Sequence, residues 1–406
     1  MRILFINQFY WPDAAATSQL LTDVTRALAA EGHEVEVVCS KGSYASVEVA
    51  DNAPATKVHR LVCAPYLRGR VGRCLSYLSF FFGCLWKGLR IPKVDLVVTM
   101  TTPPLSSVIG GILQRVKGPR HFIWVMDLFP EALVDVGIFR PGSLVIRSLH
   151  WASDWSYRQA DAVVAIGECM RHRLVERRIS EDKLCIAENW ADGREIFPIA
   201  RNREGPLVIM YSGNLGLSHD IDTLLFAMKC LSGDPRFHFR FVGGGQRQRM
   251  VQAFCEEHNL QNVEFLPYCT RSKLAESLSQ ADIGLVTQRA ESAGSVVPSK
   301  LYGLMAAGRP ILYIGPRKTT PFWIIERFQC GWHADCGDGP RLVTLLEELH
   351  ARPDLVQSAG VRARNAFLRE YDLPQGVSRI CNLFGAAVRP EVVAREPAAQ
   401  TTLEGT

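Results

Sequence analysis

Residues 291–315 read Glu291-Ser-Ala-Gly-Ser295-Val-Val-Pro298-Ser299-Lys300-Leu-Tyr302-Gly303-Leu-Met305-Ala-Ala-Gly308-Arg-Pro310-Ile-Leu-Tyr-Ile-Gly315. Pro298 suits the first position of a helix, because the amide hydrogen that proline lacks is not needed there. Gly308 suits the position that ends a helix, and the apolar run after Pro310 is typical of a buried strand. The stretch therefore predicts a helix from Pro298 to Ala307 that leads into a strand, as in α/β proteins.

The start of this helix is a candidate site for an anion. Val297 offers no side-chain oxygen, so the amides of Ser299, Lys300 and Leu301 lack a capping partner unless Ser295 folds back. Free amides, the positive end of the helix dipole and the Lys300 ammonium together favour a phosphate or diphosphate. An ordinary helix with a solvated lysine is the alternative.

The rest of the chain alternates strands with helices. Residues 3–6 form a short apolar run, Leu20, Val24 and Leu28 keep helical spacing, and residues 34–39 form a second apolar run. This alternation predicts parallel, doubly wound sheets, which bind ligands at the carboxyl ends of their strands. The length of 406 residues exceeds one ordinary core and predicts two α/β domains.

Composition sets the boundaries of these domains. The stretch 189–206 is polar and carries glycines and prolines, so we place the domains at residues 1–195 and 204–372. Residues 390–406 contain too few large apolar side chains to pack and predict a flexible tail.

Charge and cysteine spacing exclude several function classes. The net charge of +5 is too small and dispersed for nucleic acid, and the 12 cysteines show no Cys-x-x-Cys spacing. We expect buried thiols in a reducing compartment and no metal site. The first residues lead straight into a strand without the layout of a signal peptide, which predicts a cytoplasmic protein.

The motif Pro298-Ser299-Lys300, with Tyr302 and Met305-Ala-Ala-Gly308-Arg-Pro310 behind it, resembles the retaining glycosyltransferases of family-4 type. The resemblance covers nearly the whole chain and is to bacterial members that build cell-surface polysaccharide. It implies the GT-B fold, in which two Rossmann-like doubly wound domains face a cleft and a helix at 376–388 packs back on the first domain. It also implies a hexosyl- or N-acetylhexosaminyltransferase (EC 2.4) that takes a sugar from a nucleoside diphosphate donor, here a UDP-sugar, without a cofactor.

The same resemblance assigns the donor site. It implies a donor-binding role for residues of the opening stretch, namely Glu291, Ser295, Pro298, Ser299, Lys300 and Tyr302. The family usually binds the donor through two glutamates eight positions apart, but Ser295 and Gly303 stand at those positions here. Relatives with a Pro-Ser-Lys helix start share this kind of loss.

A second loop, at residues 212–220, follows an apolar run that predicts a strand. Its glycines, Gly213 and Gly216, let the backbone approach a ligand, and Asn214 and His219 can donate to phosphate oxygens. In the resembled family this loop commonly supplies an arginine and a lysine to the donor diphosphate. In this chain Asn214 and His219 occupy about those positions. By resemblance too, Tyr268 ends a strand beside the donor base.

Asp127 and Glu131 form the most promising carboxylate pair of the first domain. A strand at 121–126 delivers Asp127 to its carboxyl end, and Glu131 follows in a first helical turn. We assign both as catalytic residues on the acceptor side and expect low pKa values beside a helix N-terminus. Plain capping by Asp127 is the alternative. The loop with Asp13, Ala16 and Thr17 follows the first strand, and the resemblance implies that it lies beside the donor diphosphate and the acceptor, so we assign it to the acceptor side.

Residues 68–93 combine an uncharged apolar run with flanking cations, Arg68, Arg70 and Arg73 before it and Lys87, Arg90 and Lys93 after it. The run is too short to span a bilayer. It suits either an interfacial helix on an anionic inner leaflet or a buried helix of the domain, and the two can coexist.

Three functions remain at this point. The leading one is a glycosyltransferase acting on a glycan or polyprenyl diphosphate-linked acceptor in exopolysaccharide, O-antigen or capsule synthesis. The others are a nucleotide-sugar 2-epimerase of the same architecture, and a nucleotide-sugar-binding protein without catalysis, which the missing glutamates suggest.

Overall fold

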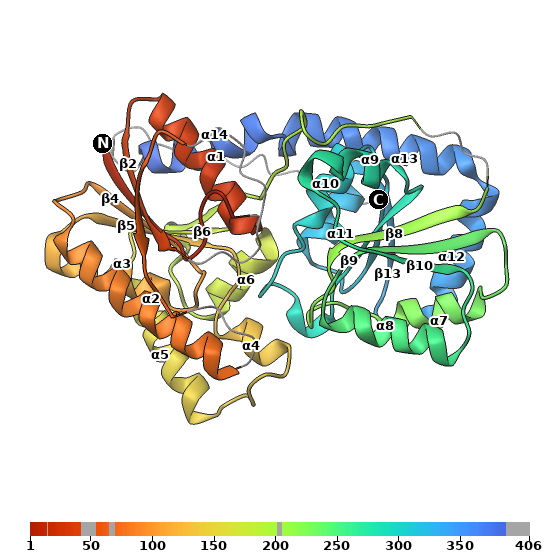
Figure 1. The fold of residues 1–406 in the computed structure, drawn as a ribbon, viewed down its shortest axis with the longest axis horizontal. Coiled ribbons are helices and arrows are strands. Elements are labelled where there is room, and N and C mark those ends of the chain that lie inside the picture. Colours follow the sequence, from red (N-terminus) through yellow and green to blue (C-terminus); the bar gives the residue numbers. More distant parts are fainter. Residues whose placement is uncertain (14, 42–53, 65–69, 201–204, 387–406) are drawn as a thin grey trace, which may run out of the picture.

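The computed structural model describes residues 1–13, 15–41, 54–64, 70–200 and 205–386. The chain forms two α/β domains that lie side by side, with the helical segment of α13 (Pro353–Ala366) and α14 (Leu373–Ala386) running along the top, α13 over the C-terminal and α14 over the N-terminal domain (Figure 1). The predicted tail at 390–406 and Arg68 lie outside the described residues.

The N-terminal domain contains a seven-stranded parallel sheet in the order β3-β2-β1-β4-β5-β6-β7. Its central strands, such as β1 and β4, are buried because helices cover both faces, as the apolar runs predicted, whereas the edge strands β3 and β7 are partly exposed. The strands are β1 (Arg2–Ile6), β2 (Glu34–Ser40), β3 (Lys57–Leu61), β4 (Leu96–Met100), β5 (Arg120–Val125), β6 (Ala162–Ala165) and β7 (Leu184–Ile186). The helices are α1 (Ala16–Ala30), α2 (Arg70–Arg90), α3 (Ser106–Lys117), α4 (Glu131–Asp135), α5 (Leu144–Gln159) and α6 (Glu168–Glu176).

The C-terminal domain repeats this plan with six parallel strands in the order β10-β9-β8-β11-β12-β13. The strands are β8 (Leu207–Asn214), β9 (Phe237–Gly244), β10 (Val263–Leu266), β11 (Ile283–Thr287), β12 (Ile311–Ile314) and β13 (Gly331–Ala334). The helices are α7 (Asp222–Cys230), α8 (Gln246–Glu257), α9 (Leu274–Ser279), α10 (Lys300–Ala306), α11 (Thr320–Phe328), α12 (Gly339–Ala351) and α13 (Pro353–Ala366). The prediction of two doubly wound parallel sheets is confirmed.

The opening stretch folds almost as its residues predicted. Gly308 has a φ of 66° just after the helix, and β12 follows as a fully buried strand. The helix itself begins at Lys300, two residues later than predicted, because Pro298 and Ser299 form a turn before it. With seven residues α10 is short, so its dipole is weaker than that of the expected ten-residue helix.

The chain crosses between the domains twice at one place. Ala191 pairs with Asp372, so the outgoing and returning segments run together. After the return, α14 (Leu373–Ala386) packs beside α1. The buried ring of Phe384 contacts Phe5 and Phe122 of the first sheet, with ring centroids 5.8 and 5.9 Å apart.

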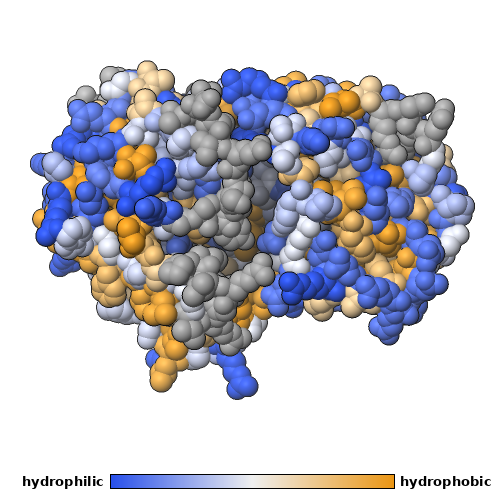
Figure 2. All heavy atoms as spheres, viewed as in Figure 1, coloured by the Kyte–Doolittle hydropathy of each residue, from blue (hydrophilic) through white to orange (hydrophobic). Residues whose placement is uncertain are grey.

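The carboxyl edges of the two sheets face each other. The segment after β5 meets the loop after β11, since Asp127 bridges to Val296 and the Leu128 amide donates to the Ser295 carbonyl at 2.8 Å. Arg173 of α6 adds a hydrogen bond to the Glu291 carbonyl at 2.9 Å. Loops at the carboxyl edges of both sheets therefore border the space between the domains, where the space-filling view shows a recess (Figure 2).

Helix α2 has two apolar faces. Its buried face includes Phe80 and Cys84, whereas five large side chains on the opposite face are exposed: Leu75, Leu78, Phe82, Trp86 and Leu89. Their spacing of three and four residues places them in one stripe. No helix in the described part of the chain has the length and apolar character needed to cross a membrane.

Candidate active site

Lys300 crosses the backbone of the loop that follows β8. Its ammonium lies 3.2 Å from the Asn214 carbonyl and 5.0 Å from the centroid of the Tyr211 ring. Gly213 makes this path available, because a Cβ there would lie 2.7 Å from Lys300 Cε and its φ is 121°. Burial lowers the pKa of the ammonium to about 8, so it is largely protonated at pH 7 but poorly solvated. An anion that replaced the lost water would be held strongly.

His219 belongs to the same loop, and its neutral ring is buried. Its Nδ1 is 2.8 Å from the Thr287 carbonyl, and its Nε2 is 3.2 Å from the Tyr211 hydroxyl. Burial and then the charge of Lys300 lower its pKa to about 3. With both nitrogens engaged inside the protein, His219 fixes the loop to β11 and is not placed to donate to a phosphate.

The other polar groups of the loop face outward. Asn214 and Ser299 are exposed, and Gly216 is partly exposed. Tyr268 is 61% exposed, with its ring against the backbone of Gly243 and Gly244. A cavity of about 580 Å³ lies beside these glycines and is lined by Gly244, Gly245, Gln246, Gln248, Arg249 and Gln252.

Three residues of the opening stretch are placed differently from the sequence assignment. Tyr302 is fully buried and packs on Tyr371 at 5.2 Å, in the core behind α10. Ser295 is also buried, and its hydroxyl donates to the Ser292 carbonyl at 3.2 Å. Glu291 is exposed and pairs with Arg289 at 3.2 Å, at the rim of the loop. Sequence position alone could not give these orientations.

Asp127 occupies the junction of the two domains. Its amide donates to the Thr101 hydroxyl at 3.1 Å, which anchors the turn after β5 to the turn after β4. Burial raises the pKa of its carboxyl to about 6. The expectation of a low pKa was therefore wrong, because desolvation outweighs the dipole of α4, which has only five residues.

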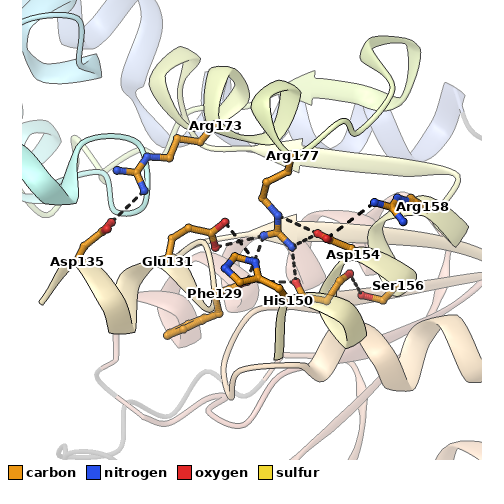
Figure 3. A network of polar contacts seen from close by, with 10 residues as sticks. Phe129, Glu131, Asp135, His150, Asp154, Ser156, Arg158, Arg173 and Arg177 are labelled. Atoms are coloured by element: carbon orange, nitrogen blue, oxygen red, sulfur yellow. Dashed lines mark hydrogen bonds and ion pairs between the residues drawn. The ribbon is translucent and has the colours of Figure 1, made fainter. Parts of the chain in front are cut away.

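Glu131 points away from the junction, into a network around Arg177 (Figure 3). Its carboxylate is 3.3 Å from one Arg177 nitrogen and 3.9 Å from His150 Nδ1. Arg177 also binds Asp154 and donates to the Phe129 carbonyl at 3.3 Å. This network ties α4, α5 and α6 together, so the geometry gives Glu131 a positioning role.

The loop after β1 is held by its own contacts. Asp13 is buried and accepts a hydrogen bond from the Ala15 amide at 2.8 Å. Ala16 and Thr17 begin α1 and remain accessible, with no side chain capping the helix. In this loop the accessible groups are therefore the first amides of α1. Among the described residues, no group of three or more His, Cys, Asp or Glu is arranged to hold a metal ion.

Comparison with known proteins identifies the class. Residues 17–190 match the family described as glycosyl transferase 4-like domain, and residues 192–366 match glycosyl transferases group 1. The two matches together span 17–366, and the structure has the GT-B architecture. The chain thus belongs to the GT-B glycosyltransferases with a family 4-like and a group 1 domain.

Individual relatives are bacterial. The probable glycosyltransferase WbjE of Pseudomonas aeruginosa is 29% identical over 81% of this chain and 84% of its own length. WcaI of Escherichia coli K12, named for colanic acid biosynthesis, is 24% identical over 76% of this chain and 82% of its own. Among solved structures, sucrose-phosphate synthase of Thermosynechococcus elongatus has a TM-score of 0.78 at 16% identity, covering 96% of this chain and 100% of that one. HepE of Anabaena, solved with UDP-glucose, has a TM-score of 0.70 at 13% identity, covering 95% and 100%.

Replacing Asp127 by Asn tests the buried charge. A carboxyl whose pKa is about 6 in the folded protein and 3.8 when freely solvated reduces stability when it is ionised. The cost is full above pH 6 and absent below about pH 4. We expect Asp127→Asn to raise the free energy of unfolding of the N-terminal domain by about 1–3 kcal/mol at pH 8, and by nothing at pH 4, in urea denaturation.

Asp135→Asn is the matched control. It removes one partner of the 3.1 Å ion pair with Arg173, so we expect it to reduce stability or leave it unchanged at pH 8. An effect of Asp127→Asn that does not vary between pH 4 and 8 would contradict the assigned desolvation.

Proposed function

We propose that the protein is a retaining glycosyltransferase of the Pro-Ser-Lys kind that uses a UDP-sugar as donor. The observation that carries the proposal is the Lys300 ammonium, held at the surface of a glycine-rich loop at the carboxyl end of β8. HepE, solved with UDP and glucose and with UDP-glucose, shares the fold and supports a uridine nucleotide. Tyr268 is available beside Gly243 and Gly244 as a platform for the base.

The proposed role of Lys300 follows from the charge that develops during transfer. The bond between the anomeric carbon and the diphosphate oxygen breaks, so negative charge accumulates on the departing diphosphate. A fixed ammonium, with the exposed Asn214 and Ser299 as hydrogen-bond donors, stabilises this charge more in the transition state than in the ground state. We assign Gly213 and Gly216 to the close approach of the loop, and His219 to its positioning.

On the acceptor side we assign Asp127 as the residue that contacts the acceptor hydroxyl. With a pKa of about 6 it is mainly ionised at neutral pH and can accept the hydroxyl hydrogen bond. Thr17 and the first amides of α1 border the same carboxyl edge. Glu131 acts through Arg177, by holding the segment that carries Asp127.

The acceptor that fits the first domain best is a polyprenyl diphosphate-linked glycan of surface polysaccharide synthesis. The exposed stripe of α2 is joined by apolar side chains of α5, where Leu144, Val145 and Trp151 are exposed. Both helices pack on α3, and apolar residues gather along this lower edge of the domain (Figure 2). Lys87, Arg90 and Lys93 lie at one end of the stripe, as suits an anionic leaflet.

The same helix touches the acceptor loop. Ser76, on the buried face of α2, accepts a hydrogen bond from Gln8 at 3.2 Å, and Gln8 lies two residues after the end of β1. The exposed stripe therefore lies about one helix diameter, roughly 10 Å, from the loop that precedes α1. An enzyme resting on this face would meet a lipid-linked sugar at its acceptor side.

Replacing Lys300 by Ala should reduce kcat/KM on the true donor by roughly ten- to a thousandfold, the usual loss for one group that stabilises a developing oxyanion. Release of UDP across a panel of UDP-sugars and acceptors measures it. Lys229→Ala removes an exposed lysine of α7 and should leave turnover unchanged. Unchanged turnover of Lys300→Ala would remove Lys300 from the mechanism.

Co-sedimentation with vesicles tests the membrane surface. The unmodified protein should bind vesicles rich in anionic lipid and bind neutral vesicles less. Phe82→Ser with Trp86→Ser should release it, since the two side chains are 65% and 56% exposed and can enter the acyl boundary. Val361→Ser, at an exposed apolar position of α13, is the control. Equal, negligible binding of the unmodified protein to both vesicle types would leave a soluble acceptor.

A further inference from the structure

The turn between β9 and α8 is packed directly on the glycine-rich loop after β8. Gly245 has a φ of 133°, and a Cβ at this position would collide with the Leu215 backbone. The Arg247 amide donates to the Leu215 carbonyl at 3.0 Å. The first turn of α8 thus has a fixed position beside the loop that carries Lys300.

The Arg247 side chain leaves this turn without forming an ion pair with any residue that the structure describes, although its charge acts on the Glu291 carboxyl. The Arg247 side chain is half-buried, and its Nε is buried without a hydrogen bond. Such a guanidinium group is costly to bury unless an acceptor oxygen binds it. The missing acceptor is therefore expected to come from a ligand.

Electrostatic effects on neighbouring groups place Arg247 near the glycine-rich loop and near Glu291. Its charge, after burial and Lys300, contributes to the low pKa of His219. The pKa of Glu291 is lowered first by a backbone hydrogen bond and then by Arg289, and the charge of Arg247 adds to this effect. Arg247 therefore lies close to both residues.

We infer that Arg247 binds the diphosphate of the donor together with Lys300. This inference rests on the proposed nucleoside diphosphate-sugar donor. The loop after β8 carries Asn214 and a neutral His219, so it supplies no cation itself; Arg247 and Lys300 supply two from neighbouring elements. A guanidinium can bind two phosphate oxygens at once, which fixes the diphosphate for departure.

Calorimetric titration of the purified protein with UDP and with uridine tests the inference. Arg247→Gln should weaken UDP binding about tenfold or more, since a charged hydrogen bond is lost, and should leave uridine binding unchanged. Arg247→Lys should recover part of the loss. Lys229→Gln, which removes an exposed charge of the same domain, should bind both ligands as the unmodified protein does.

The outcomes separate this inference from the proposed function. If the unmodified protein binds UDP and Arg247→Gln binds it equally well, the inference is overturned and the donor proposal stands. Equal weakening of UDP and uridine by Arg247→Gln would also overturn it, because the residue would then support the fold of the site. If the unmodified protein binds neither UDP nor ADP or GDP, both proposals fall.

Discussion

The Lys300 ammonium rests on the Asn214 carbonyl, across a backbone that only glycine at 213 leaves open. This crossing depends on the parallel sheet, which brings the ends of β8 and β11 to one edge and starts α10 beside them. The turn after β9 closes on the same loop through Gly245. The segments after β8, β9 and β11 thus leave the poorly solvated Lys300 ammonium at the edge of the sheet. The binding of an anion stabilises such a charge more than it would a well-solvated one.

The first domain places a charge of opposite sign near the junction. Asp127 is partly buried where its own domain meets the loop after β11, and this desolvation raises its pKa to about 6. A fold selected only for stability would not keep such a carboxyl, because its ionisation at neutral pH costs free energy. Around it, Thr101 and the Arg177 network fix the backbone on both sides. The arrangement is typical of active sites, where desolvated groups are held by well-paired neighbours.

The fold could be predicted from the sequence because its signals are local. Pro298, Gly308 and the apolar runs mark helices and buried strands without knowledge of the rest of the chain, and the alternation of strands and helices then restricts the sheets to parallel ones. The position of Lys300 at the start of a helix was also predictable, because Pro298 marks that start two residues earlier. The orientations of Tyr302 and His219 were not, because they depend on Tyr371, Tyr211 and Thr287, which are distant in sequence or lie on another strand. Arg247 was missed because a single arginine in a polar helix has no distinctive pattern.

Ser295 and Gly303 stand at the positions where the resembled family has its two glutamates, and the structure shows what Ser295 does instead. Ser295 turns inward to hold its own loop, and its carbonyl joins the domains. The affinity of UDP as a function of pH tests the resulting account most directly, because it rests on a cation at Lys300. A free-protein pKa of about 8 that rises on binding predicts an affinity that falls by about twofold between pH 7 and 8 and by a factor approaching tenfold per pH unit above about pH 9, with no such loss in Lys300→Ala. An affinity that stays constant from pH 7 to 9.5 in the unmodified protein would contradict it.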